Sequence, residues 1–160
     1  MKKGFVLVLA AAVALLGTAC GGKDEETAVD LTALYMAIAE DLGWSEDYMA
    51  AIEGDMLESY YPGLGDLPLK QLIARTPAMS SDVNELVFLE CETDADADTA
   101  EAILQDRVDS QASGGAWYAE SMEAWENASV LRQGRYVAMI ASAAEQEKLE
   151  QQFLNAFGEQ

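Results

Sequence analysis

The chain contains no histidine among its 160 residues. This absence excludes Ser-His-Asp triads, Cys-His pairs, zinc sites with histidine ligands, and the usual proton shuttle at neutral pH. The catalytic chemistries that remain use paired carboxylates, lysine or tyrosine, or hard cations held by oxygen atoms. The sequence shows no clear constellation for any of them, which favours a non-enzymatic role.

Basic residues are also scarce, with 9 lysines and arginines against 29 acidic residues and a formal net charge of −20. Such a chain repels phosphate backbones and anionic lipid headgroups, so we expect neither nucleic-acid binding nor adsorption to membranes through charge. A basic or cationic ligand fits this charge better. A dense acidic surface can also serve only to keep an exposed protein soluble and monomeric.

The first of only two cysteines, Cys20, ends a segment organised like an export signal. Two lysines open the chain, residues 5–16 are mostly apolar, and small residues precede the cysteine. That order is typical of a signal peptide, and the apolar run is too short for a spanning helix of about 20 residues. The segment before Cys20 resembles a bacterial lipobox, although Gly17 replaces the usual leucine. We therefore predict a lipoprotein signal peptide over residues 1–19 and a flexible acidic tether over residues 20–29.

Lipid attachment at Cys20 would place the protein at the outer face of the cytoplasmic membrane. Two acyl chains, such as palmitate, anchor a protein stably where one chain does not. The alternative is an ordinary signal peptide cleaved after Ala19, which leaves no anchor. With Cys20 capped by lipid, Cys91 has no partner for an intramolecular disulfide, so we expect a buried structural cysteine.

Residues 30–160 are predicted to form a single α+β domain. Helices are expected at residues 30–43, 48–61 and 93–111, and after a capping box at 142–145. Strands are expected at residues 69–75, 85–92, 129–132 and 136–140, the last two joined as a hairpin. The strand at 85–92 is apolar on both faces, which favours the interior of a sheet. The order of elements predicts a small, largely antiparallel sheet with helices packed on one face.

Three segments that follow Cys20 carry a resemblance to a known family. They are Asn-Glu-Leu at residues 84–86, Gly-Ala-Trp-Tyr-Ala-Glu-Ser at 115–121, and Gln-Gly-Arg-Tyr-Val-Ala-Met-Ile at 133–140. The chain resembles a family of small lipoproteins from Gram-positive gut bacteria, catalogued as a domain of unknown function, number four-three-five-eight. Ala119 stands where the family often has proline. The resemblance implies a cell-surface setting and supplies no catalytic or binding residues.

A first candidate site is formed by the alternating carboxylates Asp94, Asp96 and Asp98. Alternating carboxylates open the calcium loop of an EF-hand. The rest of that loop does not follow, because Thr99 replaces the glycine at its sixth position and Gln105 replaces the glutamate at its twelfth. Acidic residues are also favoured in the first turn of any helix by its dipole. These residues are therefore weak candidates for a metal site. The alternative interpretation is that they only form the start of a helix.

A second candidate site is formed by Trp117, Tyr118 and Trp125, with glutamates interleaved. Aromatic rings beside carboxylates can form a platform that stacks on a sugar or attracts a cation. The alternative is a loop whose rings simply pack onto the sheet.

These features favour a membrane-anchored accessory or binding domain that needs no cofactor and whose ligand is unknown. One alternative is a hydrolase of envelope or dietary polymers, which requires two carboxyl groups about 5 to 9.5 Å apart. The other alternative is a surface module that responds to cations.

Overall fold

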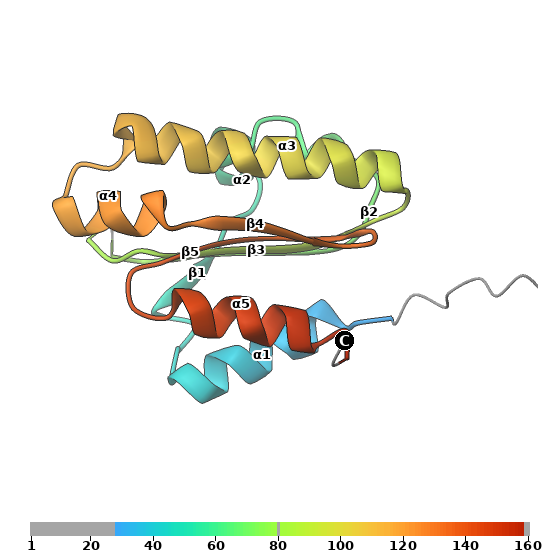
Figure 1. The fold of residues 1–160 in the computed structure, drawn as a ribbon, viewed down its shortest axis with the longest axis horizontal. Coiled ribbons are helices and arrows are strands. Elements are labelled where there is room, and N and C mark those ends of the chain that lie inside the picture. The colour runs from blue at the N-terminus through green and yellow to red at the C-terminus, as the bar shows by residue number, and fades with distance from the viewer. Residues whose placement is uncertain (1–27, 80, 159–160) are drawn as a thin grey trace, which may run out of the picture.

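The computed structural model describes residues 28–79 and 81–158, which form one five-stranded antiparallel sheet with helices on both faces (Figure 1). The strands are β1 (Met49–Ala51), β2 (Leu69–Pro77), β3 (Asn84–Cys91), β4 (Ser129–Gln133) and β5 (Tyr136–Ser142). The helices are α1 (Leu31–Leu42), α2 (Asp55–Tyr60), α3 (Asp94–Ser110), α4 (Ala119–Glu126) and α5 (Gln146–Asn155). A short 3₁₀ turn (Leu64–Asp66) precedes β2, and a π-helical turn (Gln111–Gly115) links α3 to α4. The predicted α+β class and antiparallel sheet are confirmed.

The central strand β3 organises both halves of the core. The strand order is β1-β2-β3-β5-β4, so β3 pairs with β2 on one side and with β5 on the other. Its side chains alternate between the two faces, as the pleat of a strand requires. Val87 and Leu89 belong to one buried cluster, whereas Leu86 and Phe88 belong to the other. The prediction of an interior strand is confirmed.

Helices α1 and α5 cover one face of the sheet. The ring of Phe88 stacks on that of Phe153 from α5, with 5.6 Å between the centroids. Phe157 meets both Phe153 and Tyr136 edge to face. Aromatic pairs of this geometry add to the apolar area that they bury, so they hold the last helix against the sheet.

Helices α2, α3 and α4 cover the opposite face (Figure 1). Helix α3 buries Ala97, Ala100, Leu104 and Val108, which lie along one side at helical spacing. The prediction that helices cover only one face is therefore wrong. Since β3 and β5 are buried on both faces, each face needs its own layer of helices.

The ends of the long helices follow signals that the sequence predicted. The carboxylate of Asp30 accepts a hydrogen bond of 3.0 Å from the Ala33 amide, and Gly43 ends α1 in the left-handed region with φ 68°. The hydroxyl of Thr93 accepts a hydrogen bond of 3.2 Å from the Asp96 amide at the start of α3. Both helices are confirmed.

Two elements differ from the prediction. The predicted helix over residues 48–61 is instead strand β1 followed by the short helix α2. They are separated at Gly54, whose φ of 54° and ψ of −128° do not suit a helix. Residues 119–126, where no helix was expected, form helix α4. Its N-cap, Tyr118, makes no capping hydrogen bond through its side chain, so the sequence carries no start signal there.

The first residues of the described chain are fastened to the sheet. Val29 is buried, its amide donates to the hydroxyl of Tyr136 at 3.2 Å, and its carbonyl accepts from the side chain of Gln71 at 2.9 Å. The packed domain therefore includes Val29, which was assigned to the tether. The predicted signal peptide and Cys20 lie outside the described residues. Within the described part of the chain, no helix is long and apolar enough to cross a membrane.

Candidate functional site

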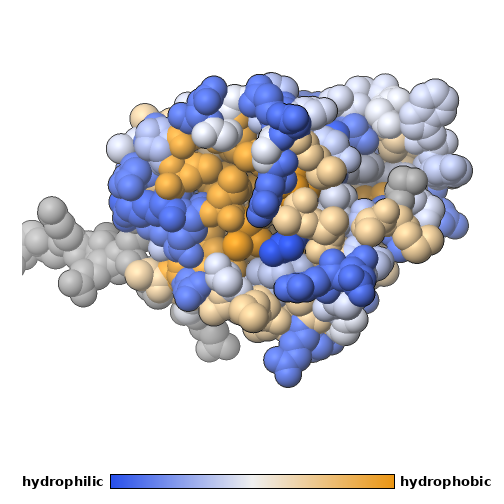
Figure 2. Space-filling view, turned by 180° about the vertical axis from the view of Figure 1, so that it is seen from behind, coloured by the Kyte–Doolittle hydropathy of each residue, from blue (hydrophilic) through white to orange (hydrophobic). Residues whose placement is uncertain are grey.

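A cleft of about 720 Å³ opens at the end of the sheet where β3 begins. Its walls come from the end of β2, the start of β3, the C-terminal part of α3, and the π-helical turn with α4. A volume of this size is typical of small-molecule pockets. A smaller groove of about 250 Å³ runs beside β2 and is lined by Leu57, Leu72 and Ile73. Figure 2 shows apolar side chains gathered on that rear face of the molecule.

The floor of the cleft is an ion pair between Glu85 on β3 and Arg107 on α3. The Nε and Nη2 atoms of Arg107 each donate to a carboxylate oxygen of Glu85 at 2.9 Å. The hydroxyl of Tyr61 donates to the same carboxylate at 2.5 Å. Such paired, charge-assisted hydrogen bonds fix both side chains. The two opposite charges compensate each other, so the floor is polar without a net charge.

Aromatic rings hold the guanidinium group of Arg107 in place. Its central carbon lies 4.2 Å from the ring centroid of Tyr60 and 5.2 Å from that of Trp125. The faces of aromatic rings attract cations. Burial alone would lower the pKa of Arg107, but the hydrogen bonds and charge of Glu85 outweigh it and raise that pKa. Arg107 therefore stays charged at every physiological pH.

Tyr61 is a fixed hydrogen-bond donor. Burial, reinforced by the negative charge of Glu85, holds the pKa of its hydroxyl well above the ordinary value of 10.0. Neither Tyr61 nor Arg107 changes its protonation near neutral pH. The floor is thus suited to hold a constant shape and polarity rather than to exchange protons.

Exposed apolar side chains surround the mouth of the cleft. Trp117 is 90% exposed, Tyr118 64%, Met79 62% and Met56 42%, and all four line it. The described residues contain six exposed large apolar side chains in total. The concentration of four of them at one cleft indicates an interaction site, because such residues are otherwise scattered singly over a surface.

The π-helical turn places the aromatic residues of the mouth. Gly114 has φ 133°, which side chains rarely allow, and a Cβ atom on Gly115 would lie 2.9 Å from the carbonyl oxygen of Ser110. Both positions therefore need glycine. Here the turn leads directly to Trp117 and Tyr118.

The structure brings the three predicted aromatic residues to one cleft but gives them different roles. Trp117 and Tyr118 lie at the exposed mouth, whereas Trp125 is buried in the floor against Arg107. The ion pair of Glu85 and Arg107 was missed, because the two residues lie 22 positions apart in the sequence. The available signal was Glu85 itself, since a carboxylate within a buried strand requires a partner.

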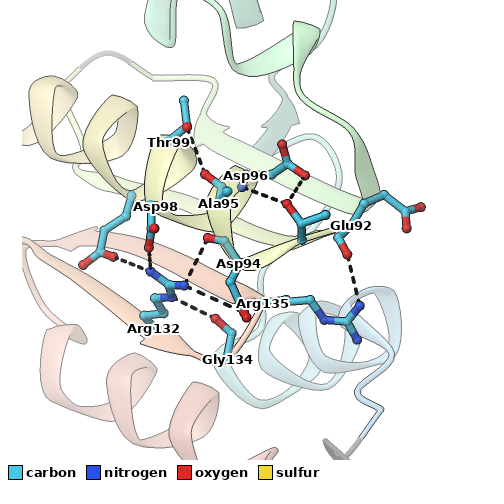
Figure 3. Close-up of polar contacts among 11 residues, drawn as sticks. Glu92, Asp94, Ala95, Asp96, Asp98, Thr99, Arg132, Gly134 and Arg135 are labelled. Carbon is cyan, nitrogen blue, oxygen red and sulfur yellow. Dashed lines mark hydrogen bonds and ion pairs between the residues drawn. The ribbon is translucent and has the colours of Figure 1, made fainter.

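The predicted metal residues are engaged in contacts within the protein (Figure 3). Arg132 on β4 forms an ion pair with Asp98 and donates to the backbone carbonyl of Asp94 at 3.2 Å. The carboxylate of Asp96 accepts from the hydroxyl of Thr93 at 2.6 Å. These contacts fix the start of α3. Over residues 28–79 and 81–158, no group of three or more potential ligands is arranged to hold a metal ion.

Cys91 is free and buried. Burial, with a smaller effect from the charge of Asp96, raises the pKa of its thiol to about 11. The thiol is therefore protonated at neutral pH and is a poor nucleophile. Its surroundings agree with the predicted structural role.

Comparisons with known proteins support the family that the sequence suggested. No curated protein and no solved structure matches the chain. A family model matches residues 43–142, more than half of the chain, and this span includes every residue that lines the cleft. The chain belongs to the family described as Domain of unknown function (DUF4358).

Proposed function

We propose that this protein is a lipoprotein, anchored through Cys20 at the outer face of the cytoplasmic membrane, whose domain binds a ligand without transforming it. The observation that carries the binding role is the concentration of exposed apolar side chains at the mouth of one cleft. The ligand would occupy that cleft.

The chemistry of the cleft supports binding more than catalysis. Its carboxylates are Asp82 and Glu85, and both oxygens of Glu85 already accept hydrogen bonds from Arg107. A carboxylate-based hydrolase needs two carboxyl groups free to transfer a proton and to attack or to activate water. Releasing Glu85 would leave the buried charge of Arg107 without its partner, which is costly.

The anchor is supported by the sequence around Cys20, where lysines, an apolar run and small residues occur in the order of a lipoprotein signal. The test is the variant Cys20→Ser, compared with wild type by membrane fractionation and mass spectrometry. We expect the variant to leave the membrane fraction or to keep its signal peptide. An unlipidated Cys20 at the N-terminus of the wild-type protein would rule out the anchor.

The binding role can be tested with methionine residues as reporters. In protein labelled with ¹³C at the methionine methyl groups, fragments of cell envelope should shift the NMR signals of Met56 and Met79, which line the cleft. Met36 on α1 is the control, because its exposure of 65% is close to the 62% of Met79 but it lies on the other face of the sheet. Equal shifts at all three residues would indicate unspecific contact and contradict the proposal.

A further inference from the structure

We infer that the ligand of the cleft is a peptide segment with one bulky apolar side chain next to several basic residues. This inference rests on the proposed binding function and deepens it. The apolar side chain would occupy the cleft, and the basic residues would cross α4 into a second, acidic groove.

The acidic groove lies on the other side of α4 from the cleft. It has a volume of about 600 Å³ and runs between α4 and the start of α5. Four carboxylates line it and no lysine or arginine does; they are Glu120, Glu123, Glu147 and Glu150. A groove with charges of one sign attracts ligands of the opposite sign.

Helix α4 joins the two grooves. Tyr118, Ser121 and Trp125 line the cleft, whereas Glu120 and Glu123 line the acidic groove. Because residues one or two positions apart point to different sides of a helix, one short helix presents an apolar face and an acidic face to adjoining grooves. A ligand that crosses α4 would contact both faces.

The composition of the mouth favours a peptide over a sugar. Two of the four exposed side chains are methionines, Met56 and Met79. Methionine is flexible and polarizable, and it is common on surfaces that bind varied peptide side chains. Tryptophan, tyrosine and arginine are the residues that most often dominate the binding energy of protein interfaces. All three types meet here in Trp117, Tyr118 and Arg107.

One polar side chain is available to the backbone of a bound peptide. Ser121 is only 7% exposed, lines the cleft, and its hydroxyl makes no hydrogen bond to any of the described residues. The hydroxyl is accessible from the cleft, so a ligand can form a hydrogen bond with it. A peptide carbonyl or amide within the cleft would satisfy it.

The experiment measures binding of a fluorescein-labelled nine-residue peptide that carries one phenylalanine followed by four lysines, using protein purified from expressing cells. Two matched peptides replace the phenylalanine with serine or the lysines with glutamates. We expect the serine peptide to bind about tenfold more weakly, since it lacks the apolar anchor. The glutamate peptide should show no binding, because its charge has the sign of the groove.

Variants on the two faces of α4 separate the two contributions. Trp117→Ala should weaken binding about tenfold at any salt concentration. The double variant Glu120→Gln/Glu123→Gln should weaken it about tenfold at low salt and much less at high salt. Met36→Ser and Glu40→Gln are controls on the exposed surface of α1, and each should change binding less than about twofold. Circular dichroism checks that every variant folds.

The outcomes show whether the inference about the ligand fails alone or together with the proposed binding function. Equal affinities for wild type and Trp117→Ala, or for the phenylalanine and serine peptides, would overturn the inference. A neutral oligosaccharide of four N-acetylglucosamine units serves as the competing probe. If it shifts the methyl signals of Met56 and Met79 and the peptide does not, the cleft binds sugars and the peptide inference is wrong. If no probe shifts them, both the inference and the proposed binding function fail.

Discussion

The two ends of strand β3 each bury a glutamate, and the two glutamates are held in different ways. Glu85, at the start of the strand, is paired with Arg107 and Tyr61, which are themselves largely buried. Glu90, near the end, accepts from Gln71 at 2.8 Å and lies 3.4 Å from the ammonium group of the partly exposed Lys70. The two glutamates also face opposite sides of the sheet, as their positions in the strand require.

This difference separates a structural end of the molecule from the end that holds the cleft. At the Glu90 end, Gln71 also accepts from the Leu31 amide at 2.9 Å and donates to the carbonyl of Val29, so it fastens the first residues of the domain. At the Glu85 end, the ion pair forms the floor of the cleft. The same residue type thus stabilises the fold at one end and shapes a pocket at the other.

The strongest test of the comparison removes the partner of the more deeply buried glutamate. Arg107→Leu should lower the free energy of unfolding by about 3 to 5 kcal/mol, because it leaves Glu85 buried without a compensating charge. Urea denaturation followed by circular dichroism measures this. The double variant Glu85→Leu/Arg107→Leu should recover much of the loss. A loss below about 1 kcal/mol in the single variant would show that water reaches Glu85 freely.

A second prediction concerns the turn at the cleft end. Gly115→Ala should cost about 1 to 3 kcal/mol, because the added methyl group would press against the backbone carbonyl of Ser110. The matched control is Gly65→Ala, where the nearest atom lies 3.6 Å away in Leu57. Thermal unfolding compares the two variants. If both lose the same stability, the close approach at Gly115 is unimportant.

At the structural end, Gln71→Ala should cost about 1 to 2 kcal/mol, because it removes hydrogen bonds to Val29, Leu31 and Glu90. Hydrogen exchange should become faster at the Leu31 amide, while amides around the cleft stay protected. Lys70→Ala is the control and should cost less, since that ion pair is partly exposed. Faster hydrogen exchange at the amides around the cleft as well would show that the two ends of the molecule are not independently stabilised.

The smallest effect is expected for Arg132→Ala, which removes the contacts to the start of α3. Its ion pairs with Asp98 and Glu101 lie at the surface, so the loss should be about 1 kcal/mol or less and should shrink as salt is added. Urea denaturation at two salt concentrations measures it. A loss comparable to that of Arg107→Leu would show that exposure does not distinguish the two arginines.

The sequence predicted the elements whose signals are local. Helices α1 and α3 carry their caps in the adjacent residues Asp30, Gly43 and Thr93, and the β4–β5 hairpin is connected at Gly134. Strand β3 was recognisable because consecutive residues in it are apolar, whereas a strand buried on one face needs an apolar residue only at every second position. Each of these signals acts within a few residues, where patterns of spacing and turn chemistry decide the structure.

The sequence could not predict the features that depend on distant contacts. Strand β1 exists because Met49 pairs with Pro77, and the run around it otherwise has the spacing of a helix. The cleft combines residues from Ala50 to Trp125, and its floor joins Glu85 to Arg107. The aromatic residues of the candidate site were identified, but which of them is exposed depends on the π-helical turn.

The attachment of Val29 has a consequence for how the domain would be presented on a surface. Figure 1 shows the described chain beginning at the end of the sheet away from α4, whereas the cleft lies beside α4. The eight residues of β3 separate these ends by roughly 25 Å, at about 3.3 Å per residue. If the chain is anchored at its N-terminus as proposed, the mouth of the cleft points away from the bilayer. A ligand that arrives from the medium then reaches the cleft before it reaches the membrane.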